Sequence, residues 1–341
     1  MVRRRAVLII ALALAGCGGP AKGPAAPAGE AGLALTVEDV IVPGEAMIIR
    51  TSMATLQDSR LTSVLLGGLE RQATGSVPAL GRALEAAERA PIEDATDIIV
   101  TGRSLDESSA LLVVAVAYEK DVDWFEDFVL DFHAKKYEAG TLAALEEGAM
   151  LGVLARDTTL SWGTDLRASV CAVRFTPRLV AYLAAPDPGE CRVWASWIIA
   201  RKGGDSKLIG KLSRAPEIGG KPPPLAVYVD GAEFEKLCCT PWNLTTILAG
   251  VAEAWIGLDP DAPATLRIVA AYDRPERALM KRDALAKMLD VYAPTVRLFV
   301  PGLGSSLDAM ELEVEGSLLI LGLTVDALTV ESVADLLSTM L

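Results

Sequence analysis

The hydrophobic and polar positions of the chain alternate in a way that predicts short strands separated by helices. In the N-terminal part, residues 46–51 predict a strand that is followed by a helical stretch from Met53 towards Arg71. Residues 97–102 and 110–118 then predict two strands joined by an acidic turn. Apolar side chains at helical spacing predict an amphipathic helix after this hairpin: Val122, Phe125, Phe128, Val129 and Phe132.

The C-terminal part repeats the same order of elements. The expected strands lie at residues 225–229, 255–258 and 265–272, with a helical stretch from Glu233 towards Trp255 after the first of them. A further helix follows that hairpin, with apolar positions Leu279, Leu285, Ala286 and Leu289. Each part then offers more strands (160–162, 171–175 and 179–183; 310–314 and 318–323) and a closing helix (191–201; 330–341).

This order predicts an α+β fold made of two related halves, each with antiparallel strands and packed helices. The shared order favours an internal duplication, although low identity between the halves leaves a chance resemblance open. The first half is expected at residues 34–202 and the second at 225–341. Between them, residues 203–224 are rich in glycine and proline and are interpreted as a linker.

The N-terminus has the pattern of an export signal. Arg3, Arg4 and Arg5 precede a run of apolar residues at 6–15, which is shorter than the roughly 20 residues that span a bilayer. Small residues then lead to a cysteine in Leu14-Ala15-Gly16-Cys17, and this segment resembles the lipobox of bacterial lipoproteins. An ordinary secretory signal that happens to contain a cysteine is the alternative.

The resemblance implies cleavage between Gly16 and Cys17, which removes residues 1–16 as a lipoprotein signal peptide. Cys17 would then carry diacylglycerol and usually an acyl group on its new amino terminus. Two or more acyl chains anchor a protein stably, whereas one chain binds only marginally. Residues 17–33 are interpreted as the lipidated cysteine and a Gly/Pro/Ala tether. Because Gly18, rather than aspartate, follows Cys17, an outer membrane location, on its periplasmic or surface face, is favoured over the inner membrane.

Composition and charge exclude several classes of protein. The net charge is −13, and removal of the three signal arginines changes it to −16. A chain this acidic is not an ordinary nucleic-acid binder, because neutralising phosphates needs a basic surface. Its apolar fraction of 51% is too high for a disordered chain. With lipid as the only means of attachment that the sequence suggests, the expected partners are the membrane and a protein or an apolar ligand.

Four cysteines remain after Cys17: Cys171, Cys191, Cys238 and Cys239. Disulfides persist in the compartment of an exported protein, so these residues are candidates for structural disulfides. Four cysteines allow three pairings, and the sequence leaves all three open.

The sequence contains no recognisable catalytic apparatus. Histidine, the commonest general base, occurs once, as His133, and no serine nucleophile motif or phosphate-binding loop is present. Asp123, Asp127 and Asp131 are spaced so that one helix would stack them, which makes them candidate cation ligands as well as candidates for a solvated face. No metal or cofactor is otherwise implied.

We therefore expect a lipid-anchored envelope protein that acts without catalysis, binding a protein partner or an apolar ligand or serving a structural role. The alternative is a hydrolase whose carboxylates come together only in the folded protein.

Overall fold

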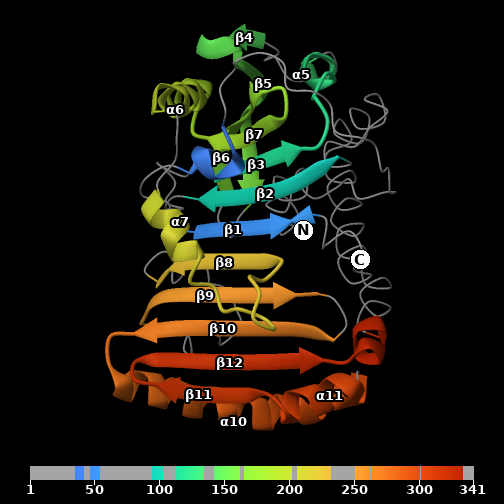
Figure 1. Cartoon of the computed structure of the whole chain (residues 1–341), viewed down its shortest axis with the longest axis vertical. Coiled ribbons are helices and arrows are strands. Elements are labelled where there is room, and N and C mark those ends of the chain that lie inside the picture. Colours follow the sequence, from blue (N-terminus) through green and yellow to red (C-terminus); the bar gives the residue numbers. More distant parts are fainter. Residues whose placement is uncertain are drawn as a thin grey trace. The chain divides into compact units, whose positions relative to one another are not determined.

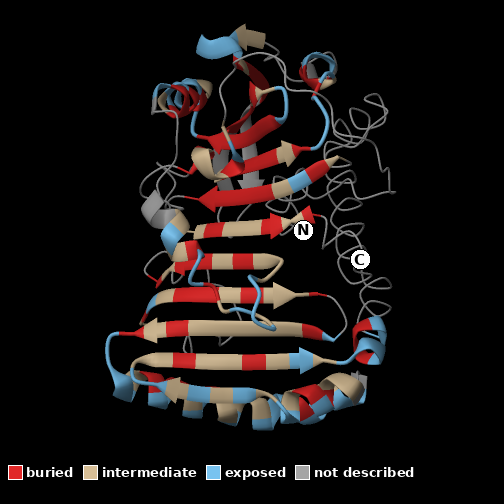
Figure 2. Cartoon of the chain, in the orientation of Figure 1, coloured by how far each residue is buried: buried red, intermediate tan, exposed pale blue. Residues whose placement is uncertain are grey.

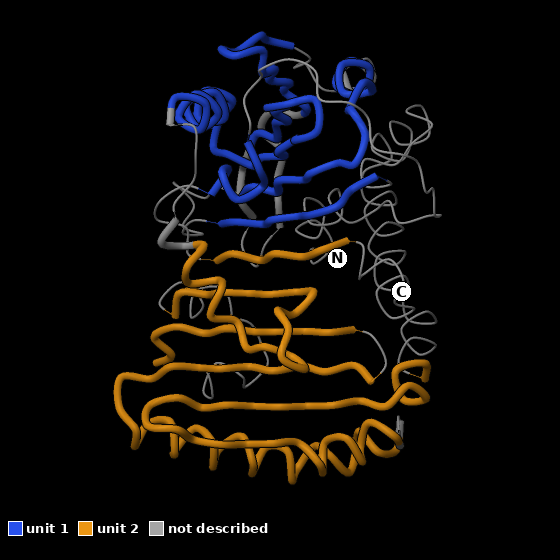
Figure 3. The backbone as a smooth tube through the Cα atoms, in the orientation of Figure 1, with its two compact units in different colours: residues 1–45, 66–206 blue, residues 46–65, 207–341 orange. Residues whose placement is uncertain are grey.

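The computed structural model describes residues 35–41, 47–53, 94–102, 112–133, 142–161, 165–201, 206–231, 250–260, 263–299 and 301–332. The chain divides into two compact units, which Figure 3 distinguishes by colour. Unit 1 comprises Met1–Glu45 and Leu66–Ser206, and unit 2 comprises Ala46–Leu65 and Lys207–Leu341. Each unit is described by itself.

Unit 1 contains an antiparallel sheet with helices packed on it (Figure 1). Its elements are η1 (Val37–Val40), β2 (Ala95–Gly102), β3 (Leu112–Tyr118), α5 (Phe125–His133), β4 (Leu142–Ala144), η2 (Glu146–Gly148), β5 (Met150–Ser161), β6 (Asp165–Thr176), β7 (Leu179–Ala185) and α6 (Pro188–Arg201). The strand order is β2-β3-β7-β6-β5-β4. The chain therefore makes one hairpin, passes through α5, and returns so that β7 pairs with β3.

The strands of unit 1 are buried because α5 and α6 cover opposite faces of the sheet. Phe128 of α5 contacts Tyr182 of β7, while Cys191 of α6 is bonded to Cys171 of β6. Register places Cys171 opposite Leu183, the neighbour of Tyr182, so the two helices contact alternate positions of the strands. Every residue of β7 is buried, and Figure 2 shows the central strands of this unit in the colour of buried residues.

Unit 2 contains a second set of antiparallel strands. Its elements are β1 (Met47–Ser52), α7 (Ser206–Leu212), which starts at the unit boundary, β8 (Leu225–Asp230), β9 (Val251–Asp259), β10 (Ala264–Tyr272), α10 (Pro275–Phe299), α11 (Pro301–Asp308), β11 (Glu311–Glu315) and β12 (Leu318–Val325). The strand order is β1-β8-β9-β10-β12-β11. Strand β1 belongs to this unit although it precedes all the strands of unit 1 in the sequence.

The two faces of this sheet contact different parts of the chain. Ala278 of α10 packs with Ala254, Ala270 and Leu319 on one face. On the other face, α7 and residues 213–224 cross β8, β9 and β10 (Figure 1). Trp255 Nε1 donates a hydrogen bond of 2.9 Å to the carbonyl oxygen of Lys211, and a Cβ added to Gly257 would lie 2.7 Å from the carbonyl oxygen of Pro216. This close approach requires glycine at position 257.

The prediction of a mixed fold with antiparallel strands and packed helices is confirmed. Residues 206–224, which lie inside the predicted linker, form α7 and the segment that packs on the sheet. Strand β9 starts at Val251, so Trp255 lies inside a strand rather than at the end of a helix. Strands β5 and β6 each span 12 residues, so they are much longer than the strands predicted at residues 160–162 and 171–175.

Candidate functional site

The predicted lipidation site, Cys17, and the cleavage position at Gly16 lie outside the described residues, as do Cys238 and Cys239. The anchor therefore stays a prediction from the sequence. None of the helices in the described ranges combines the length and the apolar character needed to cross a bilayer.

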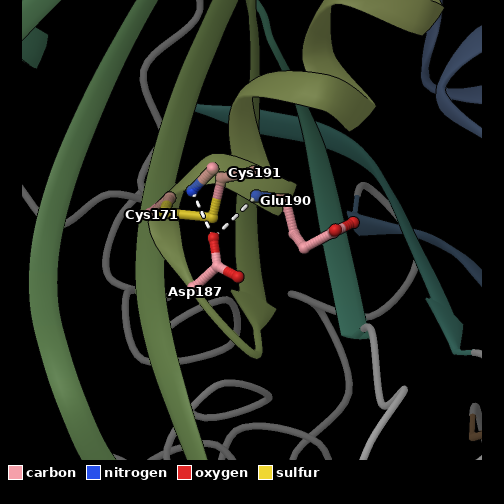
Figure 4. Close-up of a disulfide and its surroundings, with 5 residues drawn as sticks. Cys171, Asp187, Glu190 and Cys191 are labelled. Atoms are coloured by element: carbon pink, nitrogen blue, oxygen red, sulfur yellow. Dashed lines mark hydrogen bonds between the residues drawn. A yellow bond between two sulfur atoms is a disulfide. The ribbon is translucent and has the colours of Figure 1, made fainter.

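Cys171 and Cys191 form a disulfide that joins β6 to the first turn of α6 (Figure 4). Both residues are fully buried. Asp187 positions this turn: its Oδ1 accepts hydrogen bonds from the backbone N–H groups of Gly189 (2.6 Å) and Glu190 (3.1 Å). Pro188 follows as the first helical residue, where its missing N–H costs nothing. The disulfide therefore holds the capped start of α6 against β6, and its role is structural.

Of the three candidate cation ligands, the structure describes the side chains of Asp123 and Asp127. Asp123 lies in the turn before α5, which begins only at Phe125, and Asp127 is exposed on the helix. Asp131 lies near the end of α5, and its side chain is not among those that the structure describes. Within the ranges that the structure describes, no group of three His, Cys, Asp or Glu side chains is arranged to hold a metal ion.

Among the described residues of unit 2, Lys211, Tyr228 and Glu253 form a connected polar cluster. Lys211 Nζ donates to the Tyr228 hydroxyl at 2.8 Å and lies 2.8 Å from Glu253 Oε1. The Tyr228 hydroxyl in turn donates to the same Glu253 oxygen at 3.0 Å. These contacts connect α7 with strands β8 and β9, because Tyr228 and Trp255 are register partners on the face that α7 covers.

The contacts within this cluster shift the pKa of each of its three side chains. The hydrogen bond to Glu253 raises the pKa of Lys211, and the hydrogen bond from Lys211 lowers the pKa of Glu253. Burial raises the pKa of Tyr228 above its ordinary value. A general acid or base works best when its pKa lies near the working pH, and all three groups are shifted away from neutrality. The cluster is therefore suited to holding α7 on the sheet, not to proton transfer.

The aromatic side chains of unit 1 form a core. Trp124 contacts Tyr118 at a ring-centroid distance of 5.8 Å and Phe128 at 5.7 Å, and Phe128 contacts Tyr182 at 6.4 Å. Tyr118, Phe128 and Tyr182 are buried, and burial raises the pKa of both tyrosines. Edge-to-face packing of this kind stabilises a core.

Comparisons with known proteins assign no function. No protein-family model matches the chain, and no curated protein matches it. Two solved structures of TP0453, crystal forms I and III, are similar to it with TM-scores of 0.48 and 0.47 and identities of 12% and 11%. Each alignment covers 90% of this chain, and 98% and 99% of those chains respectively.

Sequence reasoning missed the cluster of Lys211, Tyr228 and Glu253. Tyr228 and Glu253 belong to strands whose pairing is non-local, and Lys211 lies in a segment rich in glycine and proline. One signal was available: Ser206–Leu212 contains Leu208, Ile209 and Leu212, an apolar spacing typical of a short amphipathic helix.

Proposed function

We propose that this protein is a lipid-anchored envelope lipoprotein whose folded part binds a partner or an apolar ligand without catalysing a reaction. The observation that carries the anchor is the sequence Leu14-Ala15-Gly16-Cys17 after a basic and apolar leader. Residues 17–33 would hold the folded part away from the membrane. Gly18 favours the outer membrane as the site of attachment.

The binding role is supported by apolar strand positions in unit 2 that remain partly accessible. Leu266 pairs with Leu323, and Ile268 pairs with Leu321, across β10 and β12. These side chains are half-buried and lie on the same face as Ala270 and Leu319, against which Ala278 of α10 packs, whereas β7 of unit 1 is buried throughout (Figure 2). Apolar positions that stay partly accessible beside a covered part of the sheet are where an apolar molecule or a partner could bind.

The paired state of the Lys211, Tyr228 and Glu253 cluster weighs against the hydrolase alternative. Each of these groups already has a partner within the cluster, and the pKa shifts move away from neutral pH. No described observation favours a catalytic role over a binding role.

We further infer that the two units descend from one repeated element. In unit 1, hairpin β2–β3 and hairpin β6–β7 meet where β3 pairs with β7, and α5 lies between them in sequence. In unit 2, hairpin β9–β10 and hairpin β11–β12 meet where β10 pairs with β12, and α10 and α11 lie between them. An experimental structure in which these two sets of strands cannot be superposed would contradict the duplication.

Metabolic labelling with radioactive palmitate in a bacterial host tests the anchor. The full chain should incorporate label, Cys17→Ser should not, and Cys239→Ser should label like the parent chain. Label retained in Cys17→Ser would overturn the lipoprotein assignment.

Organic extraction of the protein purified from the envelope, followed by mass spectrometry, then tests for a bound apolar molecule. A parallel search for a reproducible protein partner covers the other form of binding.

A further inference from the structure

We draw no further inference here: the strongest candidate, the surface patch on the unit 2 sheet where the three exposed glutamates of β11 border Leu318 and Ile320 of β12, carries nothing, because charged side chains are the usual protection of an edge strand and nothing in the structure shows what covers the patch.

Discussion

Cys171 and Cys191 are joined across 20 positions of sequence, from the middle of β6 to the first turn of α6. Removing the bond with Cys171→Ala and Cys191→Ala should lower the free energy of unfolding by about 3 kcal/mol, the loop-closure contribution expected for a loop of this size. Urea denaturation of the parent and the double variant under oxidising conditions measures the difference.

The reduced parent chain provides the control for this prediction. With a reductant present throughout, the parent and the double variant should unfold at similar urea concentrations, because neither then has the cross-link. A parent whose midpoint is the same with and without reductant would show that the bond contributes nothing to stability.

Substitution by alanine should have opposite effects on stability at two glycines, Gly210 in α7 and Gly257 in β9. Gly257→Ala places a methyl group 2.7 Å from the carbonyl oxygen of Pro216 and 3.1 Å from Cγ of Pro223, which should cost about 1–3 kcal/mol. Gly210→Ala meets no atom within 4 Å and lies inside α7, so it should stabilise the protein by up to about 1 kcal/mol. Thermal unfolding of both variants gives the signs. If both substitutions have the same sign, the segment does not pack on β9 as described.

The fold class followed from the sequence because apolar periodicity reports local structure. Short runs such as residues 179–183 and 318–323 are strands in the structure, and Phe125 and Phe128 of α5 lie on a buried helix face. Candidate chemistry was harder to place. The carboxylate of Glu253 and the amine of Lys211 are 42 positions apart in sequence and meet only because β8 pairs with β9 and α7 packs across them. No local spacing encodes a contact of that kind.

The disulfide shows the same limit. Four cysteines left three pairings open, and the choice depends on how far apart the Cα atoms lie in the folded chain. Cys171 and Cys191 lie 6.5 Å apart by that measure, which is within the range that a disulfide spans. Only the packing of α6 on β6 and β7 brings them there.

Phe128 should contribute more stability than any exposed residue of α5. Its ring is 1% exposed and lies between those of Trp124 and Tyr182, so Phe128→Ala should lower the free energy of unfolding by about 3–5 kcal/mol. Leu130→Ala on the same helix is the control, because Leu130 is 50% exposed and its loss should change stability by less than about 0.5 kcal/mol. Similar losses from both substitutions would contradict the assigned orientation of α5.

The ion pair between Lys211 and Glu253 should make stability depend on pH on the acid side. The pKa of Glu253 is lower in the folded protein than its ordinary value of 4.5, so the unfolded chain binds the proton more tightly. The stabilisation is therefore complete above pH 4.5 and is lost as the pH falls through the folded-state pKa. Because both side chains are partly exposed, at 36% and 29%, Glu253→Gln should cost only about 1 kcal/mol at pH 7.

Urea denaturation from pH 3 to pH 7 should show the parent and Glu253→Gln converging as the pH falls. Glu217→Gln removes the same charge from an exposed position in the segment after α7 and should follow the parent at every pH. A constant gap between the parent and Glu253→Gln down to pH 3 would mean that the carboxylate charge is not what holds α7 to the sheet. The hydrogen bonds that do not need the Glu253 charge, such as the one from Lys211 to the Tyr228 hydroxyl, would then have to account for that attachment.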